Sequence, residues 1–219
     1  MQSRISPLPE SIASRLPSGR HSLTRELVLA SQRGRLLDAM AQAVAEHGYG
    51  ATTVAQVVEK AGVSRKTFYE HFADKEECFI VLYETGIAYV LGRILEALEG
   101  HDDPRERVGI GLRAFLGVLS EEPAFCRAMV AEAQAAGAVA VKRRRMVLRI
   151  FAERYLELNR LAREADPSVP ALSEDVALGL VGAILELVAV RVEDGRTEAL
   201  PELADTLTEF VTRNAVAPA

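Results

Sequence analysis

Two short helices joined by a tight turn are predicted within residues 52–75, TTVAQVVEKAGVSRKTFYEHFADK. Thr53 is a good N-cap for the first helix, because its side-chain oxygen can accept a hydrogen bond from a free backbone N–H. Gly62 can adopt the left-handed conformation that often ends a helix, and Val63 can then pack between the two helices. Ser64 caps the second helix. This spacing predicts a helix-turn-helix, followed by the start of a third helix.

The second helix of this pair has two different faces. Phe68 and Phe72 are four residues apart and are expected to point inward. The outward residues are cationic or can form hydrogen bonds: Arg65, Lys66, Thr67, Tyr69 and His71. A short helix with an apolar back and a basic front suits the major groove of DNA. Arg65 and Lys66 are long enough to reach guanine edges, and Thr67 can meet a thymine methyl group.

The same stretch resembles the DNA-binding signature of the tetracycline-repressor-like (TetR/AcrR) family of bacterial transcriptional regulators. The resemblance runs from Leu36 to about Phe79 and depends on Gly48-Tyr49, Thr52-Thr53, Ala61-Gly62-Val63-Ser64, Thr67-Phe68-Tyr69, His71-Phe72 and Lys75-Glu76. Lys66 replaces the small residue that the family most often has there, and Glu70 sets an acid among basic groups. Both departures concern which DNA sequence is read. Beyond Tyr83 only the length and the helical layout are similar.

A set of DNA contacts follows from the motif and from the resemblance. In a helix-turn-helix the first helix crosses the DNA backbone, which assigns Thr53 and Gln56 mainly to phosphates. The resemblance implies that Tyr69, His71 and Lys75 grip the backbone on either side of the groove. Local packing of Tyr69 and His71 is the alternative. The complete predicted set is Thr53, Gln56, Ser64, Arg65, Lys66, Thr67, Tyr69, His71 and Lys75.

The distribution of charge agrees with a DNA-binding end. The net charge is −5, but residues 1–75 carry ten Lys/Arg against seven Asp/Glu, whereas the remainder carries sixteen against twenty-four. A basic part can face phosphates while an acidic bulk keeps the protein off non-specific DNA. No apolar run has the length of a membrane span, and the N-terminus has no signal-peptide pattern, so we expect a cytoplasmic location and no membrane partner.

The whole chain reads as all-α, with Trp absent and few aromatic residues. We expect a flexible arm over residues 1–22, a helix-turn-helix domain over 23–73, and a helical ligand-binding and dimerisation domain over 74–219. Arg15 and Arg20 could let the arm reach a minor groove; a tail without function is the alternative. The predicted helices cover about 24–47, 53–61, 64–72, 74–98, 104–122, 123–130, 139–163, 174–193 and 200–214.

A dimer is predicted from the helix at residues 174–193. Between Val176 and Val190 its only charged residue is Glu186, and a surface helix of a monomer would not be apolar all round. Together with the last helix of each subunit it would form a four-helix bundle about a two-fold axis. The expected interface residues are Gly179, Gly182, Leu187, Leu203, Leu207 and Phe210. The alternative is that this helix is simply the core of one subunit.

A ligand pocket between the later helices is also predicted. Its candidate residues are Tyr83, Phe115, Phe125, Met129, Phe151, Tyr155 and Glu186. Each apolar member could instead be ordinary core. Glu186, a lone carboxylate on an apolar helix, would either face a cationic ligand or pair with Arg191 at the rim of the dimer.

No catalytic motif appears in the sequence, so we expect no enzyme and no cofactor. The four histidines share no metal-ligand spacing, and Cys78 and Cys126 are expected to be buried, reduced thiols rather than a redox pair. The resemblance implies a homodimeric repressor that a small, largely apolar molecule releases from its DNA operator. The alternatives are a dimeric DNA binder without ligand control, and a helical ligand carrier or enzyme.

Overall fold

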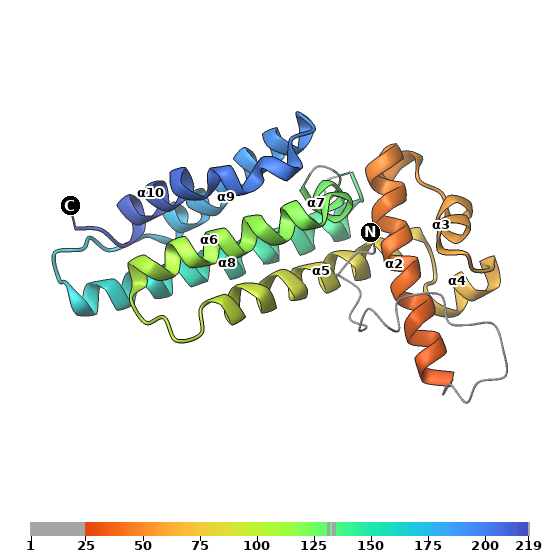
Figure 1. Ribbon diagram of the computed structural model, residues 1–219, viewed down its shortest axis with the longest axis horizontal. Coiled ribbons are helices and arrows are strands. Elements are labelled where there is room, and N and C mark those ends of the chain that lie inside the picture. Colours follow the sequence, from red (N-terminus) through yellow and green to blue (C-terminus); the bar gives the residue numbers. More distant parts are fainter. Residues whose placement is uncertain (1–24, 131, 133–134, 219) are drawn as a thin grey trace.

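The computed structural model describes residues 25–130, 132 and 135–218, and every regular element in them is helical (Figure 1). The predicted arm over residues 1–22 lies outside the described residues. The elements are α2 (Arg25–Ala51), α3 (Val54–Ala61), α4 (Arg65–His71), α5 (Lys75–Ala97), α6 (Pro104–Glu121), α7 (Pro123–Val130), α8 (Ala138–Ala165), α9 (Glu174–Glu193), η1 (Thr197–Leu203) and α10 (Ala204–Ala215). The predicted all-α class is confirmed.

The helices form two regions along the long axis of the molecule. Helices α2, α3 and α4 gather at one end, and α5, α6, α8, α9 and α10 run along the rest as an elongated bundle (Figure 1). Helix α7 packs against α2 on one side and against α6 and α9 on the other. Helix α5 also contacts both α2 and α6, so two elements join the regions.

Local signals in the sequence explain where the short helices begin and end. The Thr53 side chain accepts a hydrogen bond from the backbone N–H of Gln56, and the Gln56 side-chain oxygen accepts one from the backbone N–H of Thr53, which completes a capping box. Gly62 takes the left-handed conformation with φ of 62° and so ends α3. Ser64 caps α4, and Asp74 caps α5. The predicted helix-turn-helix is confirmed in each of these caps.

Helix α5 is the one element in the described residues that is long and apolar enough to cross a membrane by length and composition. The structure accounts for this character in another way. Phe79 and Leu82 are buried in the core that α5 shares with its neighbours, and Leu91 and Ile94 line a cavity. Its apolar side chains therefore have partners within the protein.

The chain differs from the prediction at its C-terminal end. One helix is expected over residues 200–214, but the structure has the 3-10 helix η1 followed by α10. Pro201 lies within η1, where it has no N–H to give to an α-helical hydrogen bond. The α-helix therefore starts only at Ala204.

The two cysteines behave as predicted. Cys78 and Cys126 are buried and are not joined in a disulfide. Burial raises the pKa of the Cys126 thiol to about 12 and that of Cys78 above its ordinary value. Both thiols are therefore protonated at neutral pH and serve as small core residues.

Candidate nucleic-acid interface and ligand cavity

The outer face of α4 presents exposed basic and aromatic side chains. Arg65 and Lys66 are exposed at its start, and the Lys66 side chain is 88% exposed, with Glu70 as its nearest carboxylate at 3.9 Å. A surface pair at that distance contributes little, so the lysine remains available for another anion. Tyr69 is 52% exposed on the same helix. These three are the long side chains of the predicted set that are exposed to solvent.

The hydroxyl and amide side chains of the predicted set form hydrogen bonds within the protein. The Oγ of Ser64 accepts from the backbone N–H of Thr67 and lies 2.9 Å from the Thr67 hydroxyl. Thr53 and Gln56 are held together in the capping box of α3. These residues fix the starts of the two helices. Thr53 and Ser64 are exposed and Gln56 and Thr67 are half-buried, and their contact with DNA phosphates stays a prediction.

The inner face of α4 anchors the helix to the rest of the domain. Phe68 is fully buried and Phe72 nearly so, with ring centroids 5.7 Å apart. The guanidinium of Arg33, on α2, lies 5.5 Å from the centre of the Phe72 ring. The two phenylalanines therefore tie the solvent-facing helix to α2 and the core.

Lys75 is turned inward, contrary to the predicted grip on the DNA backbone. Its Nζ donates hydrogen bonds of 2.8 Å to the carbonyl oxygens of Tyr49 and of Thr52, and it lies 4.3 Å from the centre of the Tyr49 ring. Those carbonyls belong to the junction between α2 and α3. An ammonium group held in this way stabilises the junction, so we correct the role of Lys75 from DNA contact to positioning residue.

We expect Lys75→Met to lower the thermal stability of the protein. Loss of hydrogen bonds from a charged group costs about 1.5–3 kcal/mol of unfolding free energy. In a chain of this size each kcal/mol shifts the melting temperature by about 2–4 °C. Lys60→Met is the matched control, because Lys60 forms only a solvent-exposed pair with Glu46. An unchanged melting temperature with weaker binding to every DNA would return Lys75 to the interface.

His71 also turns toward the protein. It is half-buried, and its Nε2 lies 3.5 Å from Oε1 of Gln32. Burial, helped by the nearby charge of Arg33, lowers the pKa of His71 below its ordinary value. The ring is therefore neutral at neutral pH. Its position favours the packing role that the sequence left as the alternative.

The junction between α2 and α3 receives a second contact that the sequence does not reveal. The carboxylate of Glu132, just beyond α7, accepts a hydrogen bond of 2.9 Å from the backbone N–H of Tyr49. The Tyr49 ring also packs edge-on against Phe79 of α5, with centroids 5.0 Å apart. The start of α5 and the end of α7 therefore meet at the element that positions α3 and α4.

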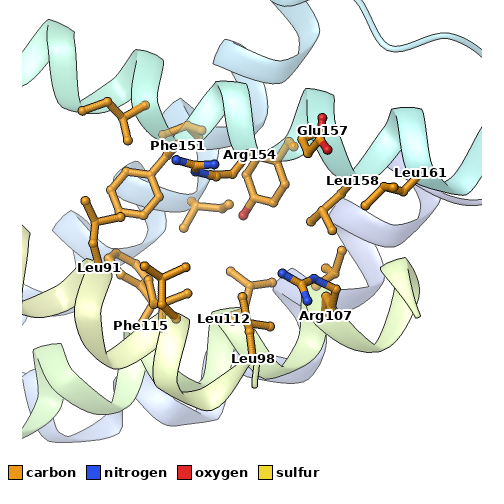
Figure 2. Close-up of a pocket in the computed structure, with 18 of the residues that line it drawn as sticks. Leu91, Leu98, Arg107, Leu112, Phe115, Phe151, Arg154, Glu157, Leu158 and Leu161 are labelled. Atoms are coloured by element: carbon orange, nitrogen blue, oxygen red, sulfur yellow. The ribbon is translucent and has the colours of Figure 1, made fainter. Parts of the chain in front are cut away.

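A cavity of about 250 Å³ lies between α5, α6, α8 and α9 (Figure 2). Its walls are mostly leucine, isoleucine, valine and aromatic side chains. Of the predicted pocket residues, Phe115, Phe151 and Tyr155 line it. Burial raises the pKa of Tyr155, so its hydroxyl is protonated at neutral pH. Arg107 and Arg154 also line the cavity, although no feature of the sequence marks them as pocket residues.

A smaller cavity of about 50 Å³ lies toward α7 and is lined by three other residues of the predicted pocket. Tyr83, Phe125 and Met129 line it, and burial raises the pKa of Tyr83 to about 12. Phe115 and Phe151 border both cavities, with ring centroids 6.1 Å apart. This pair therefore divides the space between the helices into a large and a small chamber.

Glu186 borders neither cavity and is exposed on α9, so we withdraw it from the predicted ligand site. It shares the outer side of α9 with an apolar surface. Val176, Leu178, Leu187 and Val190 are exposed there despite their apolar side chains. At Gly179 and Gly182 an added Cβ would meet nothing within 4 Å, so a second helix could approach closely.

Two residues of the predicted dimer interface lie elsewhere. Leu207 is fully buried and Leu203 nearly so, both in the core of the subunit. Their side chains already have partners within the subunit, so they are removed from the predicted interface. Phe210 of α10 is exposed and stays in it with Gly179, Gly182 and Leu187.

Comparison with known proteins places the helix-turn-helix in a family. Residues 36–82 match the model described as bacterial regulatory proteins, tetR family. The transcriptional activator FasR of Mycolicibacterium smegmatis is 26% identical over 106 residues, which cover 48% of each chain. The transcriptional repressor KstR2 of Mycobacterium tuberculosis is 34% identical over 86 residues, which cover 39% of this chain and 43% of that protein. The chain thus spans about half the length of these curated relatives.

Solved structures extend the similarity of fold over most of the chain. The fatty acid degradation regulator FadR of Bacillus halodurans superimposes with a TM-score of 0.74 at 20% identity, over 82% of this chain and 94% of that one. FadR of Bacillus subtilis, solved in complex with stearoyl-CoA, gives 0.73 at 17% identity, over 81% and 96%. The described helix-turn-helix, the family match and the shared architecture agree. Residues 36–82 therefore form a helix-turn-helix region of the kind found in the tetR family of bacterial regulatory proteins.

Proposed function

We propose that this protein is a homodimeric repressor that leaves its DNA operator when a small molecule fills the cavity between α5, α6, α8 and α9. The observation that carries DNA binding is the exposed front of α4, where Arg65, Lys66 and Tyr69 project from a helix-turn-helix. A helix of this kind places its first residues against base edges in the major groove.

The relatives support regulation and point to a ligand. KstR2 is named a repressor, and FadR of Bacillus subtilis was solved with stearoyl-CoA, a molecule with a long apolar chain. The cavity of the present chain is also lined mainly by apolar side chains. FasR is named an activator, which supports activation as the second candidate. A reporter gene behind the operator distinguishes the two, since a repressor lowers its expression and an activator raises it.

Helix α5 offers a route from the cavity to the DNA. Its last turns carry Leu91 and Ile94 on the cavity wall, followed by the C-cap residue Leu98. Its first turn holds Lys75 against the junction of α2 and α3. A ligand that fits only one position of α5 shifts the population toward that position. If that position changes the separation of the two α4 helices in a dimer, the operator is released.

DNA binding is tested by fluorescence anisotropy with a duplex from beside the protein's own gene. We expect Lys66→Ala and Arg65→Ala each to weaken operator binding by about 1–3 kcal/mol, and Lys66→Ala to relax base preference. The logarithm of the affinity should fall steeply with the logarithm of salt concentration, because phosphate contacts release counterions. Lys142→Ala is the control, since Lys142 is exposed on α8, outside the helix-turn-helix.

Two outcomes would refute the DNA-binding proposal. One is binding that does not depend on salt. The other is an equal loss of affinity in Lys66→Ala and Lys142→Ala, because α4 would then have no special role. Ligand control is tested separately, by adding a compound that binds the cavity and measuring whether the DNA is released.

A further inference from the structure

Three charged residues line the large cavity, and their partners differ. Glu157 is already neutralised: its two carboxylate oxygens accept hydrogen bonds of 3.1 and 2.6 Å from Arg160. Arg160 is not among the lining residues. The cavity therefore keeps two cations, Arg107 and Arg154, and its one carboxylate is paired with a residue behind the wall.

Arg107, on α6, has a donor that is not satisfied. One terminal nitrogen donates 2.6 Å to the backbone carbonyl of His101, but Nε is buried without an acceptor. A buried N–H without a partner is costly and rare in folded proteins. A bound acceptor would remove this cost.

Arg154, on α8, faces the cavity from another wall (Figure 2). Among the residues that the structure describes, none forms a hydrogen bond or ion pair with its guanidinium. Figure 2 shows Leu91, Phe115 and Phe151 at one end of the cavity and Leu158, Leu161 and Arg107 at the other. Arg154 is exposed to solvent, and the pKa of Glu157 is lowered mainly by its hydrogen bond to Arg160 and in part by the charge of Arg154. Neither cavity arginine is hydrogen-bonded to a carboxylate of the described residues.

We propose that the ligand of this cavity is an amphipathic anion, with its carboxylate or phosphate bound by Arg107 and Arg154 and its apolar chain directed toward Phe115 and Phe151. The planar guanidinium of arginine suits either kind of oxyanion, and hydrogen bonds between two charged groups are stronger than those between neutral groups. This proposal rests on the proposed function only in using the same cavity, since it concerns what binds and not what binding does.

The direction of the chain has a structural consequence. Phe115 and Phe151 separate the large cavity from the small one, whose wall includes Phe125 and Met129 of α7. A chain that displaces this pair reaches α7, which packs against α2. The proposed orientation thus points the apolar end of the ligand toward α7 and the helix-turn-helix region, and it leaves the anion in the large cavity, on the Arg107 side of the Phe115–Phe151 pair.

The test is isothermal titration calorimetry of the full chain with four probes that share one alkyl chain, each below its critical micelle concentration. Dodecanoate and dodecyl phosphate are anionic, dodecanol is uncharged, and dodecyltrimethylammonium is cationic. We expect both anions to bind at least about tenfold more tightly than dodecanol, and the cation to bind most weakly. Whichever anion binds better identifies the head group as carboxylate or phosphate, and dodecanoyl-CoA tests a phosphate-bearing thioester.

Variants assign the effect to the two arginines. Arg107→Gln and Arg154→Gln should each weaken binding of the anions about tenfold or more and leave dodecanol unchanged. Arg149→Gln is the matched control, because Arg149 is exposed on α8 and does not line the cavity. Circular dichroism checks that each variant stays folded.

Three results would overturn the proposal: dodecanol binding as tightly as the anions, anion binding that is unaffected in both arginine variants, or no binding of any probe. Failure of the proposed function gives a different pattern. In that case the anions bind and depend on Arg107 and Arg154, but they do not release DNA in the anisotropy assay.

Discussion

Replacing Phe68 by alanine is expected to unfold the helix-turn-helix region at temperatures where the native chain is intact. Phe68 is fully buried and lies on a helix of only seven residues. Helices of that length have little stability of their own, so α4 depends on its packing. Removing a buried phenylalanine costs about 3–5 kcal/mol of unfolding free energy. We expect a large fall in melting temperature and no measurable operator binding.

The adjacent aromatic residue supplies the control. Tyr69 follows Phe68 in the chain but is 52% exposed. Tyr69→Ala should leave the unfolding free energy within about 0.5 kcal/mol, because surface changes of this kind seldom alter stability. Tyr69→Ala should still weaken DNA binding if the tyrosine side chain contacts the DNA backbone. Equal melting temperatures for the two variants would contradict the assigned faces of α4.

Local signals were enough to predict the helix-turn-helix. The caps at Thr53, Ser64 and Asp74 and the left-handed Gly62 depend on residues within a few positions of one another. The inward direction of Phe68 follows in the same way from helical spacing. Both partners of each cap lie in the same short segment, so the tertiary structure does not alter these features.

Contacts between distant residues could not be predicted. Tyr49 and Glu132 are 83 positions apart in the chain, and no pattern in the sequence marks them as partners. The role of Lys75 was mispredicted for the same reason. The sequence shows that Lys75 lies at the start of α5, but its two carbonyl acceptors depend on how α5 packs against α2. A lysine near a recognition helix is as easily a support as a DNA contact.

The candidate ligand site shows a third kind of limit. Aromatic content identified Phe115, Phe151 and Tyr155, because large apolar side chains line most pockets. It missed Arg107 and Arg154, since charged residues on a helix usually face solvent. For Leu203 and Leu207, helical spacing alone could not separate the face that packs inside a subunit from a face that is left for a partner.

Leu187→Glu is expected to dissociate the proposed dimer into monomers at micromolar concentration. Leu187 is 42% exposed on α9, beside the bare surface at Gly179 and Gly182. In a two-fold interface each substitution occurs twice, so two carboxylates would be buried close to each other without partners. Like charges placed together in an interface cost several kcal/mol, and each 1.4 kcal/mol weakens association about tenfold. Sedimentation equilibrium measures the change directly.

The same variant should lose operator affinity although α4 is untouched. A dimer reads two half-sites, and linking two weak contacts raises affinity by about 10²–10⁴ over one alone. Val139→Glu is the matched control: Val139 is 46% exposed on α8, outside α9 and α10, so its dimer and its DNA binding should persist. If Leu187→Glu remained a dimer, the outer face of α9 would not be the interface, and its exposed leucine and valine side chains would need another partner. If it became a monomer yet bound the operator as tightly as before, half-site reading by two copies would be wrong, and one α4 helix would have to supply the whole affinity.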